Sequence, residues 1–475
     1  MRNMKVRIET ISLENFKNVE KGTISFMPGP HGEAASILGV YGQNGSGKTA
    51  LIDAVEILQK VITGSELNSA EYNYIMADKP WARLDFMFSI EDEERGEKGT
   101  IWYSFKLKKE LKEAEEQPLA VRETKQTKQD EDPYQTVVFD EGIDFSLETA
   151  TEKQRRQTMI KTDTDDIFEP KNKQNAVVGN DTQAYMKLMV EKELALRTGK
   201  SFAWHHKLAS AFSKSEEYKK FGEFLGEVRG FARNKLYIVN AGPSGGVRAS
   251  YLPLPFFIAD DHMVNPRFFT CPLNEAALMS YSNVQALKGL LPSLNLVLGQ
   301  LVPGLAIDVK EFGEELDRRG ETQVRIQLIS VRNGKEIPLK YESEGIKKLL
   351  SVLQLLIVMY NFPTVTVVID ELDAGIFEYL LGELLGVIAM YGKGQLMFTS
   401  HNLRALETLD KNFVAFTTTN PMNRYIRMQY VKPNNNLRDF YYRNIVLGGQ
   451  KDELYDETDS NQIAIAMRKA GAVVI

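Results

Sequence analysis

The hydrophobic and polar positions of this chain follow two periods, which divide its first part into strands and a helix. Apolar residues alternate with polar ones at 6–16 and 21–28, and a mostly apolar run at 34–42 leads into a glycine-rich loop. From 49 to 63 the apolar residues recur every three or four positions, which is the spacing of one helix face. The pattern therefore predicts three strands, a loop and a helix in that order.

The middle of the chain changes character twice. Residues 83–165 combine alternating apolar positions with charged stretches, so this segment is predicted to be rich in strands with exposed loops between them. Helical spacing returns at 181–234, and 235–260 is predicted to be strand and loop. No heptad pattern lasts beyond two or three repeats, so a long coiled-coil arm is not expected.

The last third of the chain carries the clearest pattern. The run VTVVID at 365–370 is mostly apolar, as in a buried strand of a parallel sheet. A turn at 332–335 is predicted to join two strands. The predicted elements are a helix at 273–299, strands at 305–312, 322–332 and 335–340, a helix at 344–360, a strand at 365–370, a helix at 376–391, a strand at 395–400, a short helix after residue 401, and strands at 413–419 and 424–431.

Composition places the chain among globular proteins. With 475 residues it is long enough for two or three domains, or for one large core with an insertion. Hydrophobic residues make up 43% and charged residues 26%, which is ordinary for this class. No apolar run reaches the roughly 18 residues needed to cross a bilayer, and the first residues lack the apolar core of a secretory signal.

Cysteine content and charge point to a compartment and limit the partners. The single cysteine, Cys271, cannot form an internal disulfide and offers no metal-site spacing. These features favour a cytoplasmic protein without a membrane partner. The net charge of -6 argues against nucleic-acid binding by the whole surface but permits local basic patches.

A phosphate-binding pattern follows the third predicted strand. The stretch from Gly42 to Thr49 satisfies G-x4-G-K-[ST] between a strand and a helix. Its glycines let backbone N–H groups turn toward a polyphosphate, and the helix N-terminus favours the anion. Lys48 would place its charge on the β- and γ-phosphates, and the Thr49 hydroxyl can be a ligand of Mg²⁺. The residues predicted to bind the nucleotide here are Gly42, Asn44, Gly45, Ser46, Gly47, Lys48, Thr49 and Ala50.

Polar residues close two later strands in a way that suits phosphate chemistry. Asp370 would lie at the carboxyl end of its strand and hold Mg²⁺ through water, and Glu371 would orient or deprotonate the attacking water. His401 follows the next predicted strand and could reach the γ-phosphate. The alternatives are two carboxylates that only cap a strand and a histidine with a structural role.

A serine and a glycine precede the helix predicted at 344–360. Ser343 is a candidate N-cap, with Gly345 two positions later. The same residues also suit an anion site, because a helix N-terminus can receive a γ-phosphate. In that interpretation the nucleotide is held by another subunit.

Together these motifs resemble the ABC-type ATPase heads of the SMC/RecF/OLD superfamily. GQNGSGKT resembles the Walker A motif, VVIDE the Walker B motif with the catalytic glutamate, ESEG a shortened signature motif, DAGIF the D-loop and FTSHN the H-switch. LENFKN, at 13–18, is similar to the N-terminal strand and turn. The resemblance covers about 1–90 and 300–430. It implies an α/β fold, a P-loop ABC-type ATPase head whose mixed sheet is flanked by helices, with a large inserted β-plus-helical region.

The resemblance also implies a domain organisation and an assembly. Residues 1–90 and 301–430 would form the two parts of the head, 91–300 the insertion, and 431–475 a C-terminal strand and helix extension. Two heads would enclose two molecules of ATP with Mg²⁺, in a homodimer or a higher homo-oligomer. Each site would combine Lys48, Thr49, Asp370, Glu371 and His401 of one chain with Ser343 and Gly345 of the other.

Length separates the branches of the superfamily. The insertion is too short for the coiled coils of chromosome-organising members, and the residues after His401 show no carboxylate cluster of a TOPRIM nuclease, so no nuclease site is expected in this chain. What remains resembles stand-alone bacterial anti-phage ATPases of the abortive-infection and PARIS type. Those proteins work with a separately encoded effector, often a TOPRIM or RloB-like nuclease, and a phage protein or nucleic acid would be the trigger.

Two other functions stay open at this stage. A RecF-like DNA-repair ATPase would need a basic track, and an ATP-dependent assembly scaffold would not need Glu371. The cluster from Trp204 to Lys207 is interpreted as structural, because adjacent histidines on a helix face different directions. Gln59 lies inside a predicted helix, so no Q-loop is assigned. The candidates for a basic track are Arg155 and Arg156, Lys171 and Lys173, Arg318 and Arg319, and Lys347 and Lys348.

Overall fold

One six-stranded sheet of the molecule is mostly parallel. The computed structural model describes residues 4–27, 35–67, 69–112, 132–240, 251–260, 263–317, 320–431, 436–456 and 458–473. Neighbouring strands of this sheet are parallel except for the last pair, β17 and β18. In spatial order the strands are β18 (Tyr425–Ile426), β17 (Val414–Thr417), β3 (Ser36–Tyr41), β16 (Gln395–Thr399), β15 (Thr366–Ile369) and β8 (Leu236–Val239).

Helices cover the two faces of this sheet, so its strands are largely buried and mostly apolar. One face packs with α1 (Lys48–Thr63), and the other with α7 (Glu344–Asn361) and α8 (Glu378–Tyr391). Along β15 the residues alternate between the two cores, since Val368 belongs to the first and Val367 to the second. Parallel strands also bring their carboxyl ends to one edge, where ligands of open α/β sheets usually bind.

The second six-stranded sheet is antiparallel and follows the predicted alternation. In β4, Leu84, Phe86 and Phe88 are buried, and the residues between them are partly exposed. Its inner face packs with α1 and with α5 (Lys219–Asn234). The sheet runs through residue 90, where the head was expected to end, because β4 pairs with β5. In spatial order its strands are β2 (Val19–Ser25), β1 (Lys5–Phe16), β4 (Ala82–Asp92), β5 (Glu97–Leu111), β6 (Tyr134–Glu148) and β7 (Lys153–Lys161).

Helices fill most of the segment between β7 and β8. The predicted helical region at 181–234 is confirmed, and one helix before it, α2, was not predicted. These helices are too short for a coiled-coil arm. They are α2 (Lys171–Val178), α3 (Thr182–Arg197), α4 (His206–Lys214) and α5.

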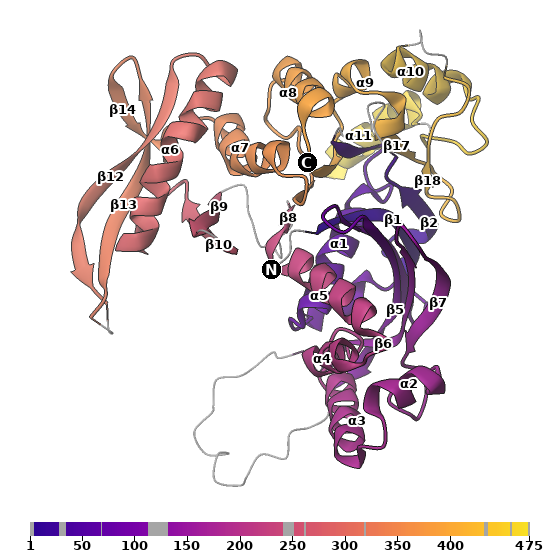
Figure 1. The fold of residues 1–475 in the computed structure, drawn as a ribbon. Coiled ribbons are helices and arrows are strands. Elements are labelled where there is room, and N and C mark those ends of the chain that lie inside the picture. The colour runs from indigo at the N-terminus through magenta and orange to yellow at the C-terminus, as the bar shows by residue number, and fades with distance from the viewer. Residues whose placement is uncertain are drawn as a thin grey trace, which may run out of the picture.

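A smaller antiparallel sheet packs against one long helix, and Figure 1 draws this unit on the opposite side of the molecule from β5 and β7. The helix predicted at 273–299 is wrong at its start, because 277–280 pair with β13 and Ser280 caps the helix. The turn at 332–335 is confirmed, with positive φ at Asn333 and Gly334. The unit consists of β11 (Ala277–Ser280), α6 (Tyr281–Leu301), β12 (Leu305–Leu316), β13 (Thr322–Arg332) and β14 (Lys335–Pro338).

The strand predicted at 424–431 is mostly wrong, since β18 ends at residue 426. The guanidinium of Arg427 donates to the carbonyl of Val414 at 2.9 Å, so a side chain takes an acceptor that a longer strand would use.

None of the helices in the described ranges could cross a membrane. The remaining elements are β9 (Tyr251–Asp260), β10 (Met263–Pro272), α9 (Ala405–Thr408), α10 (Leu437–Leu447), α11 (Ser460–Val473), and short 3-10 turns at Ser69–Tyr74, Leu339–Tyr341 and Lys411–Phe413.

Candidate nucleotide-binding site

The predicted phosphate loop connects β3 to α1 at the carboxyl edge of the parallel sheet. Gly42, Gly45 and Gly47 have φ of 152°, 74° and 95°, a region that L side chains rarely adopt. A Cβ added to Gly42 would also overlap the hydroxyl of Thr417. The loop therefore depends on glycine for its shape, as the sequence pattern requires.

The ammonium group of Lys48 is bound by backbone carbonyls of the phosphate loop. It is the first residue of α1, it is buried, and its Nζ donates to the carbonyls of Gly42 at 2.9 Å and Gln43 at 2.8 Å. Burial lowers the pKa of this amine, although nearby carboxylates, led by Asp370, raise it. Phosphate oxygens would replace two neutral carbonyls as partners, and charge-assisted hydrogen bonds are the stronger kind.

Side chains from distant parts of the sequence brace the loop. The hydroxyl of Thr417, at the end of β17, lies 2.5 Å from the hydroxyl of Ser46. Tyr425 of β18 donates to the carbonyl of Gly47 at 2.8 Å. Asn18, after β1, donates through its side-chain amide to the carbonyl of Gly45. Motif matching missed Thr417 and Tyr425, and it gave Asn18, the last residue of LENFKN, no role.

Asp370 and Thr49, the two predicted Mg²⁺ ligands, lie together. Asp370 directly follows β15 and is 3% exposed. The hydroxyl of Thr49 donates to its Oδ1 at 3.5 Å, and the hydroxyl of Thr399 donates to the same oxygen at 2.5 Å. Hydroxyl and carboxylate oxygens are the hard donors that Mg²⁺ prefers. Thr399 is a further residue that the sequence did not single out.

The donor set suits a metal shared with a substrate. Among the described residues, no three His, Cys, Asp or Glu side chains are grouped to hold a metal ion. Mg²⁺ commonly takes only one or two protein ligands and completes its shell with water and phosphate oxygens. Thr49 and Asp370 therefore fit Mg²⁺ bound together with a nucleotide.

Glu371 has an unusual backbone conformation beside these ligands. Its φ is 48°, in the left-handed region, which costs a residue with a side chain on the order of 1–2 kcal/mol. Its N–H donates to the hydroxyl of Thr399 at 2.8 Å, which fixes the turn, and its side chain is exposed. An exposed carboxylate next to the metal ligands is free to meet a water molecule.

His401 follows β16, and its backbone N–H donates to Oδ2 of Asp373 at 3.0 Å. Burial lowers the pKa of its imidazole, and the charge of Lys48 lowers it further, although Asp373 and Glu371 act in the opposite direction. The ring is therefore neutral at pH 7 and can either donate or accept a hydrogen bond. Asp373 itself lies in the DAGIF segment, so it links the predicted D-loop to the predicted H-switch.

Lys347 and Lys348 are not available for a surface DNA track, so that prediction is wrong. Both are buried in α7. Lys348 donates to the backbone carbonyl of Asp370 at 3.2 Å, and burial lowers the pKa of its amine. Lys347 pairs with Glu344 at 2.8 Å. Sequence spacing could not show this burial. Both lysines lie on the side of α7 that packs over the edge of the sheet, and helical spacing does not reveal which side that is.

Ser343 caps α7, as predicted. Its hydroxyl accepts from the backbone N–H of Ile346 at 3.4 Å. Gly345 packs directly on Gly375, and a Cβ added to Gly345 would overlap the carbonyl oxygen of Gly375. Within the described residues, neither Ser343 nor Gly345 bonds to the phosphate loop of its own chain. Their service to a nucleotide held by another chain stays a prediction.

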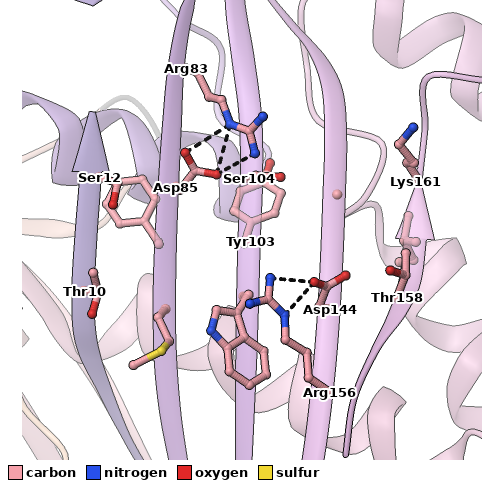
Figure 2. A pocket seen from close by; sticks show the side chains of 15 residues that line it. Thr10, Ser12, Arg83, Asp85, Tyr103, Ser104, Asp144, Arg156, Thr158 and Lys161 are labelled. Carbon is pink, nitrogen blue, oxygen red and sulfur yellow. Dashed lines mark hydrogen bonds and ion pairs between the residues drawn. The ribbon is translucent and has the colours of Figure 1, made fainter. Parts of the chain in front are cut away.

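A groove of about 370 Å³ lies on the partly exposed face of the antiparallel sheet, away from the nucleotide site (Figure 2). Arg83 pairs with Asp85 at 2.9 Å, and Arg156 pairs with Asp144 at 2.7 Å. The guanidinium of Arg156 also lies 4.5 Å from the ring centre of Trp102. The groove therefore offers an aromatic surface, two guanidinium groups and several hydroxyl groups across five strands.

The other basic candidates differ in their surroundings. Lys173 is buried, so it is excluded from a surface track, while Lys171 is exposed and pairs with Asp166 at 3.4 Å. Arg155 is exposed next to the groove residue Arg156. Arg318 and Arg319 lie outside the described residues.

The cluster from Trp204 to Lys207 and the side chain of Gln59 have structural contacts. Trp204 is buried edge-on to the ring of Tyr103 at 5.3 Å. His205 lies 3.3 Å from Glu191. Gln59 donates to two backbone carbonyls, of Ala232 and Leu236, both at 2.8 Å. These contacts favour the structural interpretation of both features.

Comparison with known proteins gives one family match, over part of the chain. Residues 10–227, a little under half of the chain, match the model of the family described as AAA domain. No curated protein matches the sequence. The similar solved structures have low sequence identity.

Three of these structures are two SMC head domains and one RecF protein. The SMC head domain bound to the C-terminal domain of ScpA, from Pyrococcus furiosus, is 13% identical, covers 89% of this chain and 96% of its own, and has a TM-score of 0.39. The SMC head domain from Thermotoga maritima is 13% identical, with 89% and 99% covered and a TM-score of 0.35. The recombination mediator RecF with ATP is 10% identical, with 84% and 94% covered and a TM-score of 0.32.

The sheets, the loop and the edge residues together define the fold class. The chain is an α/β protein with the architecture of a P-loop ATPase head, in which mixed sheets are flanked by helices and further β and helical regions are added.

Proposed function

We propose that this chain binds ATP with Mg²⁺ and hydrolyses it. The observation that carries the proposal is the meeting of Thr49 and Asp370, at 3.5 Å, beside a glycine loop whose lysine is already directed inward. The two residues are 321 positions apart in the chain. Only the parallel order of β3, β16 and β15 brings them to one edge.

Each residue has a role that follows from its position. Mg²⁺, held by Thr49 and Asp370, would neutralise charge on the phosphates. Lys48 binds the β- and γ-phosphates, and Glu371 takes a proton from the attacking water. The water oxygen bonds to the γ-phosphorus as the bond to the bridging oxygen breaks, which yields ADP and phosphate. His401, neutral at pH 7, donates a hydrogen bond to the γ-phosphate.

The proposed site is completed by a second copy of the chain. Ser343 and Gly345 at the start of α7 would receive the γ-phosphate held by the other chain, where the helix N-terminus favours the anion. ATP would then stabilise the paired state, because it binds across both chains. Hydrolysis would release the pair.

In this proposal the chain is the sensor or regulator of a bacterial anti-phage defence system in the cytoplasm. Its effector, a TOPRIM or RloB-like nuclease, is encoded separately, and a phage protein or nucleic acid is the trigger. The support is the resemblance of the motifs to such stand-alone ATPases. Isolation from the native host should recover a nuclease-like protein in a fixed ratio, and a chain that is always isolated alone would contradict this role.

Gel filtration of the Glu371→Gln variant with Mg-ATP tests the ATP-bound pair. The amide cannot take the proton, so bound ATP persists, and the variant should elute as a dimer that the nucleotide-free protein does not form. Lys48→Ala in the same background should abolish the shift. A Glu371→Gln variant that binds ATP and stays monomeric would contradict the model.

Direct binding of nucleic acid, as in a RecF-like ATPase, is the second candidate function. The groove over Trp102 and Arg156 favours it, because aromatic rings and guanidinium groups bind unpaired bases and phosphates. Fluorescence anisotropy with a labelled single-stranded oligonucleotide should show salt-dependent binding that Arg156→Ala weakens. Arg325→Ala, which removes another ion-paired arginine from a different sheet, is the control.

A further inference from the structure

The last helix of the structure, α11, lies at the surface from 460 to 471. Every residue from 460 to 471 is exposed, including the apolar side chains of Ile463, Ile465 and Met467, the last of which is 72% exposed. Asp459 caps it by accepting from the backbone N–H of Asn461 at 2.7 Å. A helix of this length is marginal alone in water, and one that is apolar on several sides is normally covered.

The root of α11 is fixed beside the phosphate loop. The backbone N–H of Asp456 donates to Oε1 of Gln43, a loop residue, at 2.9 Å. Just before it, Leu454 is buried, and Asp452 accepts from the amide of Asn420 at 2.8 Å. The helix therefore starts from an anchored position next to the nucleotide site.

A second exposed apolar surface surrounds the start of α7. Tyr341 is 71% exposed and Phe377 is 72% exposed, and Tyr379 is also exposed. The packing of Gly345 on Gly375 brings the turn that ends at Phe377 against the N-terminus of α7. We name Tyr341, Phe377 and Tyr379 the aromatic surface.

We propose that α11 of one chain docks on the aromatic surface of a second copy. This inference rests on the proposed ATP-bound pair, in which the phosphate loop of one chain faces Ser343 and Gly345 of the other. The root of α11 lies beside the first of these partners, and the aromatic surface borders the second. Two-fold symmetry then forms the contact twice, each helix covering the other chain's aromatic surface.

Charge supports the same pairing. Arg468 and Lys469 are exposed on α11. Glu344 and Glu378, at the first turns of α7 and α8, are exposed beside the aromatic surface. Glu344 also pairs with Lys347 of its own chain at 2.8 Å, so Glu378 is the main acidic partner. Opposite charges around an apolar contact favour this orientation over an association of two α11 helices with each other.

The decisive variant is Ile463→Asp with Met467→Asp, made in the Glu371→Gln protein. The two positions are one helical turn apart, so they share a face of α11. Because both side chains are exposed, the change should leave the folded monomer and its ATP affinity intact. The dimer dissociation constant with Mg-ATP, measured by mass photometry, should rise about 10-fold or more, as expected for apolar anchors.

The control is Leu296→Asp on α6. Leu296 is 72% exposed, as Met467 is, but it belongs to another part of the fold. It should leave the dimer unchanged. An α11 variant that dimerises as well as its parent would overturn the docking proposal and leave the ATP-bound pair standing. A Glu371→Gln parent that never dimerises would overturn both.

Cysteine crosslinking locates the contact directly. The chain has one cysteine, Cys271, and it is buried. Met467→Cys and Phe377→Cys, purified separately in the Glu371→Gln protein and then mixed under mild oxidation, should form a covalent dimer with Mg-ATP and little without nucleotide. A crosslink that is absent with Mg-ATP, or that forms equally without it, would contradict the proposed contact.

Discussion

The two six-stranded sheets of this protein present functional residues in different ways. The parallel sheet has short strands covered on both faces, so only its edge is open to a ligand, and Asp370, Thr399 and Thr417 all lie there. The antiparallel sheet leaves one face open, and its groove takes side chains from five strands. The residues of an edge site lie at the ends of strands, so they can be located in the sequence. The residues of a face site come together only when the strands pair in a particular register.

The largest expected effect is the loss of Lys48 at the edge site. Lys48→Ala should weaken ATP binding by about 100-fold or more, because it removes the buried positive charge that phosphate oxygens would meet. Binding of a fluorescent ATP analogue measures it. Lys153→Ala, on the exposed end of the antiparallel sheet, is the control, and comparable losses in both variants would contradict the assignment.

Glycine substitutions compare the two sheets as structures. Gly42→Ala combines a φ of 152° with an overlap on Thr417, so it should lower the free energy of unfolding by about 2–4 kcal/mol. Gly142→Ala, in the groove, meets Oγ of Ser104 at 3.1 Å and should cost less than about 1 kcal/mol. Urea denaturation gives both values, and equal costs would break the comparison.

Removing one hydroxyl group from each site should change stability less than the glycine substitutions do. Thr399→Val leaves the buried Asp370 without its 2.5 Å hydrogen bond and should cost about 1–3 kcal/mol of stability. Thr158→Val, on the open groove, should stay within about 0.5 kcal/mol of the wild type. The order of the two melting temperatures checks this, and a groove variant that melts lower would contradict it.

The smallest expected effect is a pH dependence at His401. Its pKa is lowered in the folded chain, so as the pH falls through the ordinary value of about 6.5 the unfolded chain takes up a proton first. His401 therefore lowers the free energy of unfolding at acidic pH. At higher pH its protonation does not change the stability. The stability of His401→Gln should decline less between pH 7 and 5 than that of the wild type, and parallel profiles would contradict this.

Much of the edge site could be predicted because its residues are local in sequence. The glycine loop, the carboxylates at the end of 365–370 and the histidine after 395–400 each adjoin a recognisable strand, so fold class and motif positions follow together. Thr399 and Thr417 were missed because their role comes from which strands become neighbours. Lys348 was misplaced because helical spacing alone did not show that its face of α7 would be buried.

The groove and α11 show where sequence reasoning ends. Trp102 and Arg156 are 54 positions apart in the chain, and their contact depends on the pairing of β5 with β6 and of β6 with β7. The start of α6 was misjudged because 277–280 have helical spacing but find a strand partner in β13. In each case a contact distant in sequence decides the outcome.

Phosphate release by the purified chain tests the central claim most directly. The wild type should release phosphate from ATP only with Mg²⁺, and Glu371→Gln, prepared in parallel, should bind ATP as tightly while turning it over about 100-fold more slowly, as general-base catalysis requires. Equal turnover by the two proteins, or none by a wild type that binds ATP, would contradict hydrolysis at this site and leave a scaffold that uses ATP only for assembly.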